Sequence, residues 1–160
     1  MGLDMYLDRV TMFYGTSNED ARDAAPMPVN IKNDRVKSIT ESMIYWRKSN
    51  QIHNWFVRNV QNGEDNCGTY LVNRDDISSL LAAVTAVLEA KDKSLALGAE
   101  KALTLLPPAS GFFFGSTDLD EFYWGDLVTT KMELEELLAE MDPTVPEGNF
   151  YQHYTYSSSW

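Results

Sequence analysis

Residues 45–55 read YWRKSNQIHNW, and this segment concentrates side chains that stack, donate hydrogen bonds and titrate. The period of the apolar residues around it predicts a helix over 42–61. On such a helix Trp46, Asn50 and His53 would share one edge beside the apolar stripe. A ring, an amide and an imidazole held at one edge are suited to binding a planar ligand with hydrogen-bonding groups.

Cys67, in the loop NGEDNCG, supplies the single thiol of the chain. A thiol beside an imidazole is the arrangement of Cys–His hydrolases and transferases, and only a turn separates Cys67 from the predicted helix that carries His53. No nucleophile signature surrounds Cys67, and no phosphate-binding loop, GxGxxG or HExxH motif occurs, so catalysis is not the leading interpretation. Asp118, Asp120 and Glu121 lack the spacing of an EF-hand loop and are expected to cap a helix, so neither a metal nor a cofactor is predicted.

The charge distribution separates a basic segment from an acidic one. The chain has 13 basic and 24 acidic side chains and a net charge of −11, which argues against general nucleic-acid binding. Residues 31–60 nevertheless hold six of the bases, including Arg47 and Lys48, whereas residues 117–142 hold nine acids. The acidic segment is typical of a solvated helix face or, alternatively, of a surface that binds a basic partner.

Cysteine usage and hydropathy favour a cytoplasmic location. A single cysteine excludes an intramolecular disulfide, as in proteins of reducing compartments. The first ten residues carry acids before any long apolar run, so they do not resemble a signal peptide. No apolar run has the length of a membrane span, so a membrane partner is not expected.

The apolar patterns predict one α+β domain over residues 1–160, with a small, mostly antiparallel sheet packed against three to four helices. Leu3, Met5 and Leu7 alternate with polar residues and indicate a half-buried strand at the start of the chain. The further strands are expected at 35–40, 69–72, 111–116 and 149–160, and the helices at 42–61, 73–90, 94–106 and 120–141.

Four sequence blocks are specific enough to support a resemblance. The start MGLDMYL, the pattern WRKxNxIHxWF, the segment GFFFGST and the C-terminal SSW together resemble a family of small bacteriophage and prophage proteins without an established activity. The resemblance runs from Met1 to Trp160, with segments at 15–30 and 91–104 that look individual. It implies a phage setting and a role in countering or redirecting a process of the host, and it carries over no catalytic residue.

These blocks mix glycine, aromatic and hydrogen-bonding residues, unlike the apolar stripes of the long helices expected later in the chain. We therefore expect residues 46–56, 62–68, 111–123 and the C-terminal tail to converge on one concave ligand-binding site. The residues expected to line this site are Trp46, Arg47, Lys48, Asn50, His53, Cys67, Phe113, Ser116, Tyr154 and Trp160.

The leading hypothesis is binding, without catalysis, of a small and nucleotide-like ligand in an aromatic and basic pocket. One concrete version is a phage protein that sequesters a signalling nucleotide in the host cytoplasm. The alternatives are an acidic protein that inhibits a host protein as a nucleic-acid mimic, and a small Cys–His hydrolase or transferase. The expected partner is accordingly a small molecule or a host protein, and homo-oligomerisation is left open.

Overall fold

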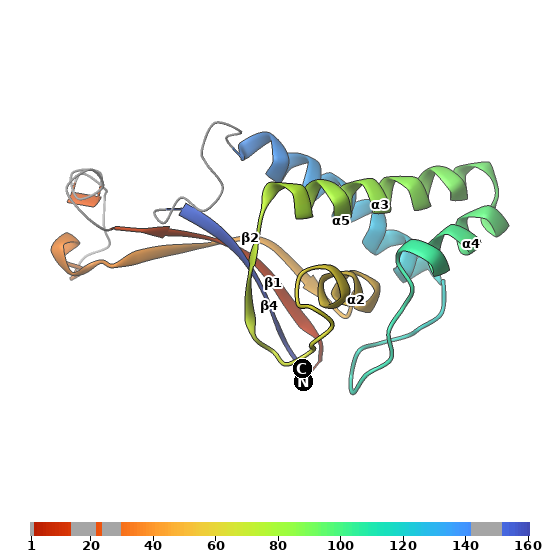
Figure 1. Ribbon diagram of the computed structural model, residues 1–160, viewed down its shortest axis with the longest axis horizontal. Helices are drawn as coiled ribbons and strands as arrows, with labels where there is room; N and C mark the ends of the chain where they lie inside the picture. Colours follow the sequence, from red (N-terminus) through yellow and green to blue (C-terminus); the bar gives the residue numbers. More distant parts are fainter. Residues whose placement is uncertain (1, 14–21, 24–29, 142–151) are drawn as a thin grey trace.

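The computed structural model describes residues 2–13, 22–23, 30–141 and 152–160. Among these residues, four α-helices accompany a four-stranded antiparallel sheet, which confirms the predicted α+β class. The strands follow the order β2-β1-β4-β3, so that strands from the two ends of the chain lie side by side at the centre of the sheet (Figure 1).

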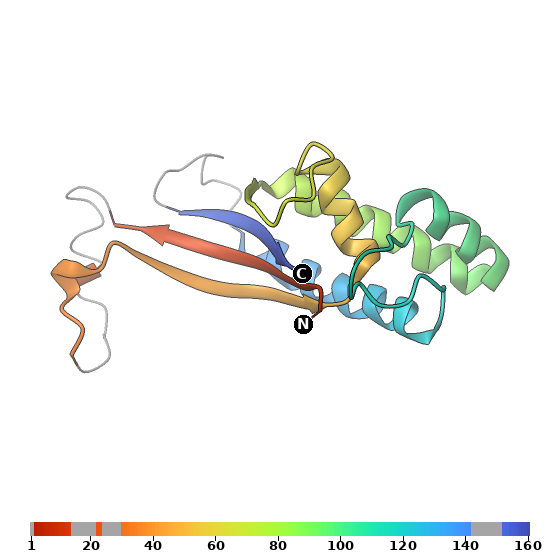
Figure 2. The same ribbon diagram turned by 90° about the horizontal axis from the view of Figure 1, so that it is seen from below.

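The central strand β1 (Asp4–Met12) pairs with β2 (Ser38–Arg47) on one side and with β4 (Gln152–Ser159) on the other. The short strand β3 (Thr69–Val72) completes the sheet beside β4. Both ends of the described chain therefore lie together. The helices lie near the end of the sheet where the two termini meet, while the opposite ends of β1 and β2 extend away from the helices (Figures 1 and 2).

The helices are α2 (Asn50–Asn59), α3 (Arg74–Lys93), α4 (Leu95–Leu105) and α5 (Glu121–Glu140). Side chains cap the three later helices by accepting hydrogen bonds from backbone N–H groups that have no partner within the helix. Asn73 and Asp76 form a reciprocal capping box at the start of α3, which confirms the start predicted there. Ser94 and Asp120 cap α4 and α5 by accepting from the N–H groups of Leu97 and Tyr123.

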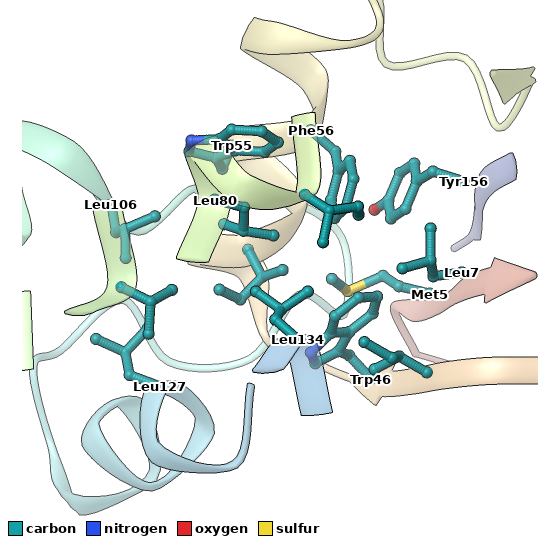
Figure 3. Close-up of a cluster of buried hydrophobic side chains, with 14 of the residues drawn as sticks. Met5, Leu7, Trp46, Trp55, Phe56, Leu80, Leu106, Leu127, Leu134 and Tyr156 are labelled. Carbon is teal, nitrogen blue, oxygen red and sulfur yellow. The ribbon is translucent and has the colours of Figure 1, made fainter. Parts of the chain in front are cut away.

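One face of the sheet and the helices enclose the hydrophobic core (Figure 3). The alternation in β1 directs Met5 and Leu7 into this core, where both are fully buried. Phe56 of α2 stacks on Tyr156 of β4 with ring centroids 3.9 Å apart, which fixes α2 against the sheet. Along the described part of the chain, no helix is both long enough and apolar enough to cross a membrane.

The helix predicted over 42–61 is wrong in its first third, because residues up to Arg47 belong to β2. The aromatic and β-branched residues of 38–47 pair with β1 over its whole length, so the strand ladder satisfies their backbone groups. Lys48 then takes a positive φ of 61°, and the helix begins only at Asn50. Of the strand predicted at 35–40, only residues 38–40 belong to β2, because Asn33–Arg35 form a 3-10 helix.

The strand predicted at 111–116 is also wrong, because GFFFGS forms a turn. Phe113 and Gly115 have φ values of 65° and 96°, which a strand does not accommodate. Only Phe114 is buried, whereas Phe112 and Phe113 are 77% and 48% exposed. The apolar run therefore contributes one ring to the core and presents two to solvent. Of the predicted terminal strand, residues 149–151 lie outside the described residues.

Candidate functional site

The imidazole of His53 is the centre of a buried polar network. It lies on the sheet side of α2 and is 1% exposed. Its Nδ1 is 2.7 Å from the Tyr156 hydroxyl, and its Nε2 is 3.1 Å from a carboxylate oxygen of Asp65. This arrangement fits the neutral tautomer in which Tyr156 donates to Nδ1 while the Nε2–H faces Asp65. The Nε2–H has no well-aligned acceptor, so the Asp65 carboxylate acts on the N–H dipole rather than through a good hydrogen bond.

Tyr156 is a neutral phenol in this network. Burial raises its pKa well above the ordinary value, and the nearby side chains of Asp65 and Cys67 raise it further. A hydroxyl that stays protonated remains a hydrogen-bond donor to His53 throughout the physiological range. The pair is therefore suited to holding α2 against β4, since neither side chain is exposed to solvent.

Asp65 extends the network to the last residue of the chain. The indole N–H of Trp160 donates to its second carboxylate oxygen over 3.0 Å. Phe114 closes the group from the other side, with its ring edge-on to both His53 and Trp160, at centroid distances of 5.3 and 5.8 Å. Asp65 and Phe114 thus connect the loop after α2, the loop before α5 and the C-terminus to α2.

Asn50 clamps the 107–118 loop by using its whole side-chain amide. Its Nδ2 donates to the carbonyls of Phe114 and Ser116 over 3.2 and 2.8 Å, and its Oδ1 accepts from the N–H of Ala109 over 3.0 Å. The residue is 1% exposed. A side chain engaged in this way has a structural role, so the predicted direct contact of Asn50 with a ligand is not available without breaking the clamp.

These contacts bring together the four blocks of 46–56, 62–68, 111–123 and the tail, as the sequence predicted. The centre at which they meet is filled by the side chains of His53, Phe114 and Tyr156. The expectation of an open pocket at that centre is therefore corrected to a packed network. Ligand-accessible atoms lie around its margin.

We call Lys48, Phe113 and Trp160 the aromatic–basic rim. The backbone brings them together around the start of β1: Lys48 N–H donates to the carbonyl of Leu3, and Leu3 N–H donates to the carbonyl of Phe113. The side chain of Lys48 runs past Gly115, which has no Cβ to obstruct it. Phe113 and Trp160 are 48% and 47% exposed, so each presents a ring face or edge to solvent.

The remaining predicted site residues lie elsewhere or act through their backbone. Trp46 is a core residue, 4% exposed, with its indole N–H bonded to Thr130 over 2.9 Å, so its expected stacking on a ligand is wrong. Arg47 is exposed on the far face of the sheet, 3.8 Å from Asp4. The hydroxyl of Ser116 accepts from the N–H of Asp118 in a local turn.

Tyr154 and Cys67 are the last two predicted site residues. Tyr154 is buried and lies opposite Arg9 in the pairing of β1 with β4, away from the rim. Cys67 is exposed in a loop with a φ of 54°. The Nδ1 of His53 is bonded to Tyr156 and its Nε2 lies against Asp65, so the geometry does not supply the Cys–His pair that a nucleophilic mechanism requires.

Asp65, Phe114 and Tyr156 were not among the predicted site residues, although they complete the network. Asp65 looked like an ordinary loop acid, and Phe114 like one of three equivalent phenylalanines. Alternation along the terminal strand places Tyr156 on the same face as Tyr154, but nothing in the sequence indicates that His53 lies opposite. Only long-range pairing reveals these partners.

A separate acidic groove lies between β2 and α5, with a volume of about 510 Å³. Arg9 crosses it, 2.7 Å from Glu41 and 3.6 Å from Glu140. The hydrogen bond from Arg9 lowers the pKa of Glu41, whereas burial and then the neighbouring Glu136 raise the pKa of Glu133. The lining residues are Arg9, Glu41, Ser42, Met43, Glu133, Glu136, Leu137 and Glu140.

Both places present groups that bind ligands through stacking or charge. The rim offers aromatic surface and an ammonium group, and the groove offers carboxylates with one guanidinium. Among the described residues, no group of three or more His, Cys, Asp or Glu side chains is arranged to hold a metal ion. Comparison with family models, with curated proteins and with solved structures finds no match to this chain.

Proposed function

We propose that this protein binds a small anionic ligand with a planar ring, such as a nucleotide, at the aromatic–basic rim, and that it does so without catalysis. The observation that carries the proposal is the placement of two half-exposed rings and an exposed ammonium group around the start of β1. Rings bind the faces of bases, and cations bind phosphates, so a nucleotide-like ligand matches both parts.

The rim is held in place before a ligand arrives. The indole of Trp160 is fixed by Asp65, and the backbone of Phe113 is fixed by Leu3. Ordering a mobile aromatic side chain costs about 0.5–1.5 kcal/mol, and this cost is reduced when the ring is already positioned. Stacking of a base on such a ring contributes about 1–3 kcal/mol.

Two exposed basic side chains offer positive charge to an anion at this end, although the chain carries a net charge of −11 and Asp4 and Asp65 lie beside them. Lys48 is exposed, and Arg47 precedes it with a side chain that reaches the neighbourhood of Gly2. Arg47 is 61% exposed and only loosely paired with Asp4, at 3.8 Å, so it is free to turn toward a phosphate. In a phage setting, the ligand would be a signalling nucleotide of the host that the protein sequesters.

The proposal is tested by calorimetric titration with AMP, GMP, a cyclic dinucleotide and inorganic phosphate, after mass spectrometry of small molecules released from the denatured protein. Trp160→Ala and Lys48→Ala should each weaken nucleotide binding by roughly tenfold or more, which corresponds to about 1.4 kcal/mol. Phosphate alone should bind weakly and should lose affinity only with Lys48→Ala.

The matched controls are Phe122→Ala and Lys101→Ala, which remove an exposed ring from α5 and an exposed ammonium from α4. Both should bind as the native protein does. Trp160→Phe keeps a ring but loses the bond to Asp65, so an intermediate affinity is expected. Equal losses in the control and rim variants, or no nucleotide binding at all, would overturn the proposal.

A second candidate function is inhibition of a basic host protein through the acidic groove. The observation that favours it is the convergence of Glu41, Glu133, Glu136 and Glu140 on one concave surface. Glu136→Lys would reverse charge there without touching the rim. If Glu136→Lys no longer inhibits the host protein while its nucleotide binding is unchanged, the second function is selected over the first.

A further inference from the structure

The face of the sheet turned away from the helices is a second surface with its own chemistry. Because Met5 and Leu7 point into the core, the alternation of β1 places Asp4 and Tyr6 on the opposite face. Strand pairing extends this relation across the sheet, since directly paired residues share a face. The register therefore determines which side chains form this surface.

One row of side chains crosses all four strands in the order Tyr45, Tyr6, Ser157, Thr69. Three strand spacings separate its ends, or roughly 14 Å. A row on one side contains Arg47, Asp4 and Ser159, and a row on the other contains Asp8, Thr155 and Leu71. We call these residues the open sheet face: Asp4, Tyr6, Asp8, Tyr45, Arg47, Thr69, Leu71, Thr155, Ser157 and Ser159.

The open sheet face combines a ring platform with hydrogen-bonding groups. The rings of Tyr6 and Tyr45 lie 5.4 Å apart with a 40° tilt, and Tyr45 is 47% exposed. The Tyr45 hydroxyl donates to Asp4, which is also 3.8 Å from Arg47. The platform is thus flanked by a carboxylate–guanidinium pair on one side and by serine and threonine hydroxyls on the other.

We infer that the open sheet face binds an uncharged polyhydroxyl ligand, an oligosaccharide. The C–H faces of a sugar ring pack on tyrosine rings, which are apolar on the face and polar at the tip. The vicinal hydroxyls of a sugar donate to a carboxylate and accept from a guanidinium, and Asp4 and Arg47 present both groups side by side. The row of about 14 Å accommodates more than one sugar ring.

Charge and polarity decide against other occupants of the open sheet face. Asp4 and Asp8 lie on it against one Arg47, and the chain as a whole carries −11, so a phosphate backbone is repelled. Stacking of a second sheet requires an apolar face, whereas serine, threonine and charged side chains dominate here. An uncharged ligand with many hydroxyls is not repelled by the carboxylates and does not need an apolar face. This surface is distinct from the aromatic–basic rim, and Arg47 lies where the two meet.

The test is an NMR titration of the isotope-labelled protein with maltotriose, cellotriose and triacetylchitotriose. Each is added to roughly 5 mM, which fills most of a site with a Kd near 1 mM. At least one trisaccharide should shift the amides of Tyr6, Tyr45, Ser157 and Thr69. Tyr45→Ala should weaken this binding by roughly tenfold, whereas Tyr45→Phe, which keeps the ring, should lose less.

Phe122→Ala, which removes an exposed ring from α5, is the control and should leave the titration unchanged. The inference is overturned if none of the three trisaccharides shifts the open sheet face, or if the shifts map to Phe113 and Trp160 instead. It is also overturned if an oligonucleotide of thymidines binds the open sheet face and the sugars do not. Nucleotide binding at the rim is measured in a separate titration. A failure of oligosaccharide binding therefore does not count against nucleotide binding, and a failure of nucleotide binding does not count against oligosaccharide binding.

Discussion

Asp65 holds two groups at once, the imidazole of His53 and the indole N–H of Trp160. A carboxylate is needed for both contacts, because an amide would face the Nε2–H and the indole N–H with only one acceptor oxygen. The residue therefore connects the buried network to the exposed rim. At the scale of single residues, the proposed ligand binding and the stability of the fold depend on the same side chain.

Adjacent residues of β2 have opposite roles, which predicts opposite results of substitution. Trp46→Ala removes a core ring and its bond to Thr130, so we expect a loss of about 3–5 kcal/mol in the free energy of unfolding. Arg47→Ala changes an exposed side chain and should stay within about 0.5 kcal/mol of the native value. Urea denaturation of both variants measures the difference. Equal stabilities would contradict the core placement of Trp46.

Cys67→Ser is expected to keep nucleotide binding at the aromatic–basic rim within about twofold of the native affinity. The thiol is exposed, and the hydrogen bonds of His53 go to other partners, so no step depends on a thiolate. Titration of the folded variant provides the measurement. If Cys67→Ser is folded but inactive, the Cys–His enzyme hypothesis returns in place of simple binding.

Two helical glycines show how packing between elements overrides helix propensity. Gly98 of α4 lies against Lys91 of α3 so closely that an added Cβ would come within 2.7 Å of the Lys91 Cα. Gly125 of α5 has open space around the same position. The same substitution therefore meets two different environments within one group of helices.

Gly125→Ala should stabilise the protein by about 0.5–1 kcal/mol, because alanine is favoured over glycine in a helix. Gly98→Ala gains the same propensity but forces α4 away from α3, so a net destabilisation is expected. Thermal denaturation of the two variants should give melting temperatures that move in opposite directions. A stabilised Gly98→Ala variant would show that α4 does not pack closely on α3.

The whole molecule should lose stability at alkaline pH. Burial raises the pKa values of Tyr123 and Tyr156 above the ordinary value of 10.0, so the folded state retains phenolic protons that the unfolded chain releases. The stabilisation is therefore complete below pH 10 and is lost as the pH rises toward the folded pKa values. Each tyrosine contributes a slope of up to about 1.4 kcal/mol per pH unit in that window.

Urea denaturation between pH 8 and pH 11.5 measures this slope. Tyr123→Phe and Tyr156→Phe should each flatten it, although both lose a hydrogen bond and start from lower stability. Tyr70→Phe, at a partly exposed phenol, is the control. A stability that stays constant above pH 10 would contradict the burial of both phenols.

Local pattern alone determined much of the architecture of the whole molecule. The alternation of Leu3, Met5 and Leu7 predicted β1, and the apolar period predicted α3, α4 and α5 to within a few residues. These elements owe their form to one buried face each, and a buried face is visible as a period in the sequence. Their caps are local too, since the capping box at the start of α3 joins Asn73 to Asp76 only three residues further on.

Only the tertiary structure decided the strand at 38–47, the turn at 111–116 and the composition of the site. YWRKSNQIHNW has a helical period, but pairing with β1 takes its first residues into the sheet. The convergence of residues 46–56, 62–68, 111–123 and the C-terminal tail was predicted from their composition. They mix glycine, aromatic and hydrogen-bonding residues, unlike the apolar stripe of a core helix. The contacts of His53 with residues 12 and 103 positions away follow from strand order and loop closure, which leave no mark in local sequence.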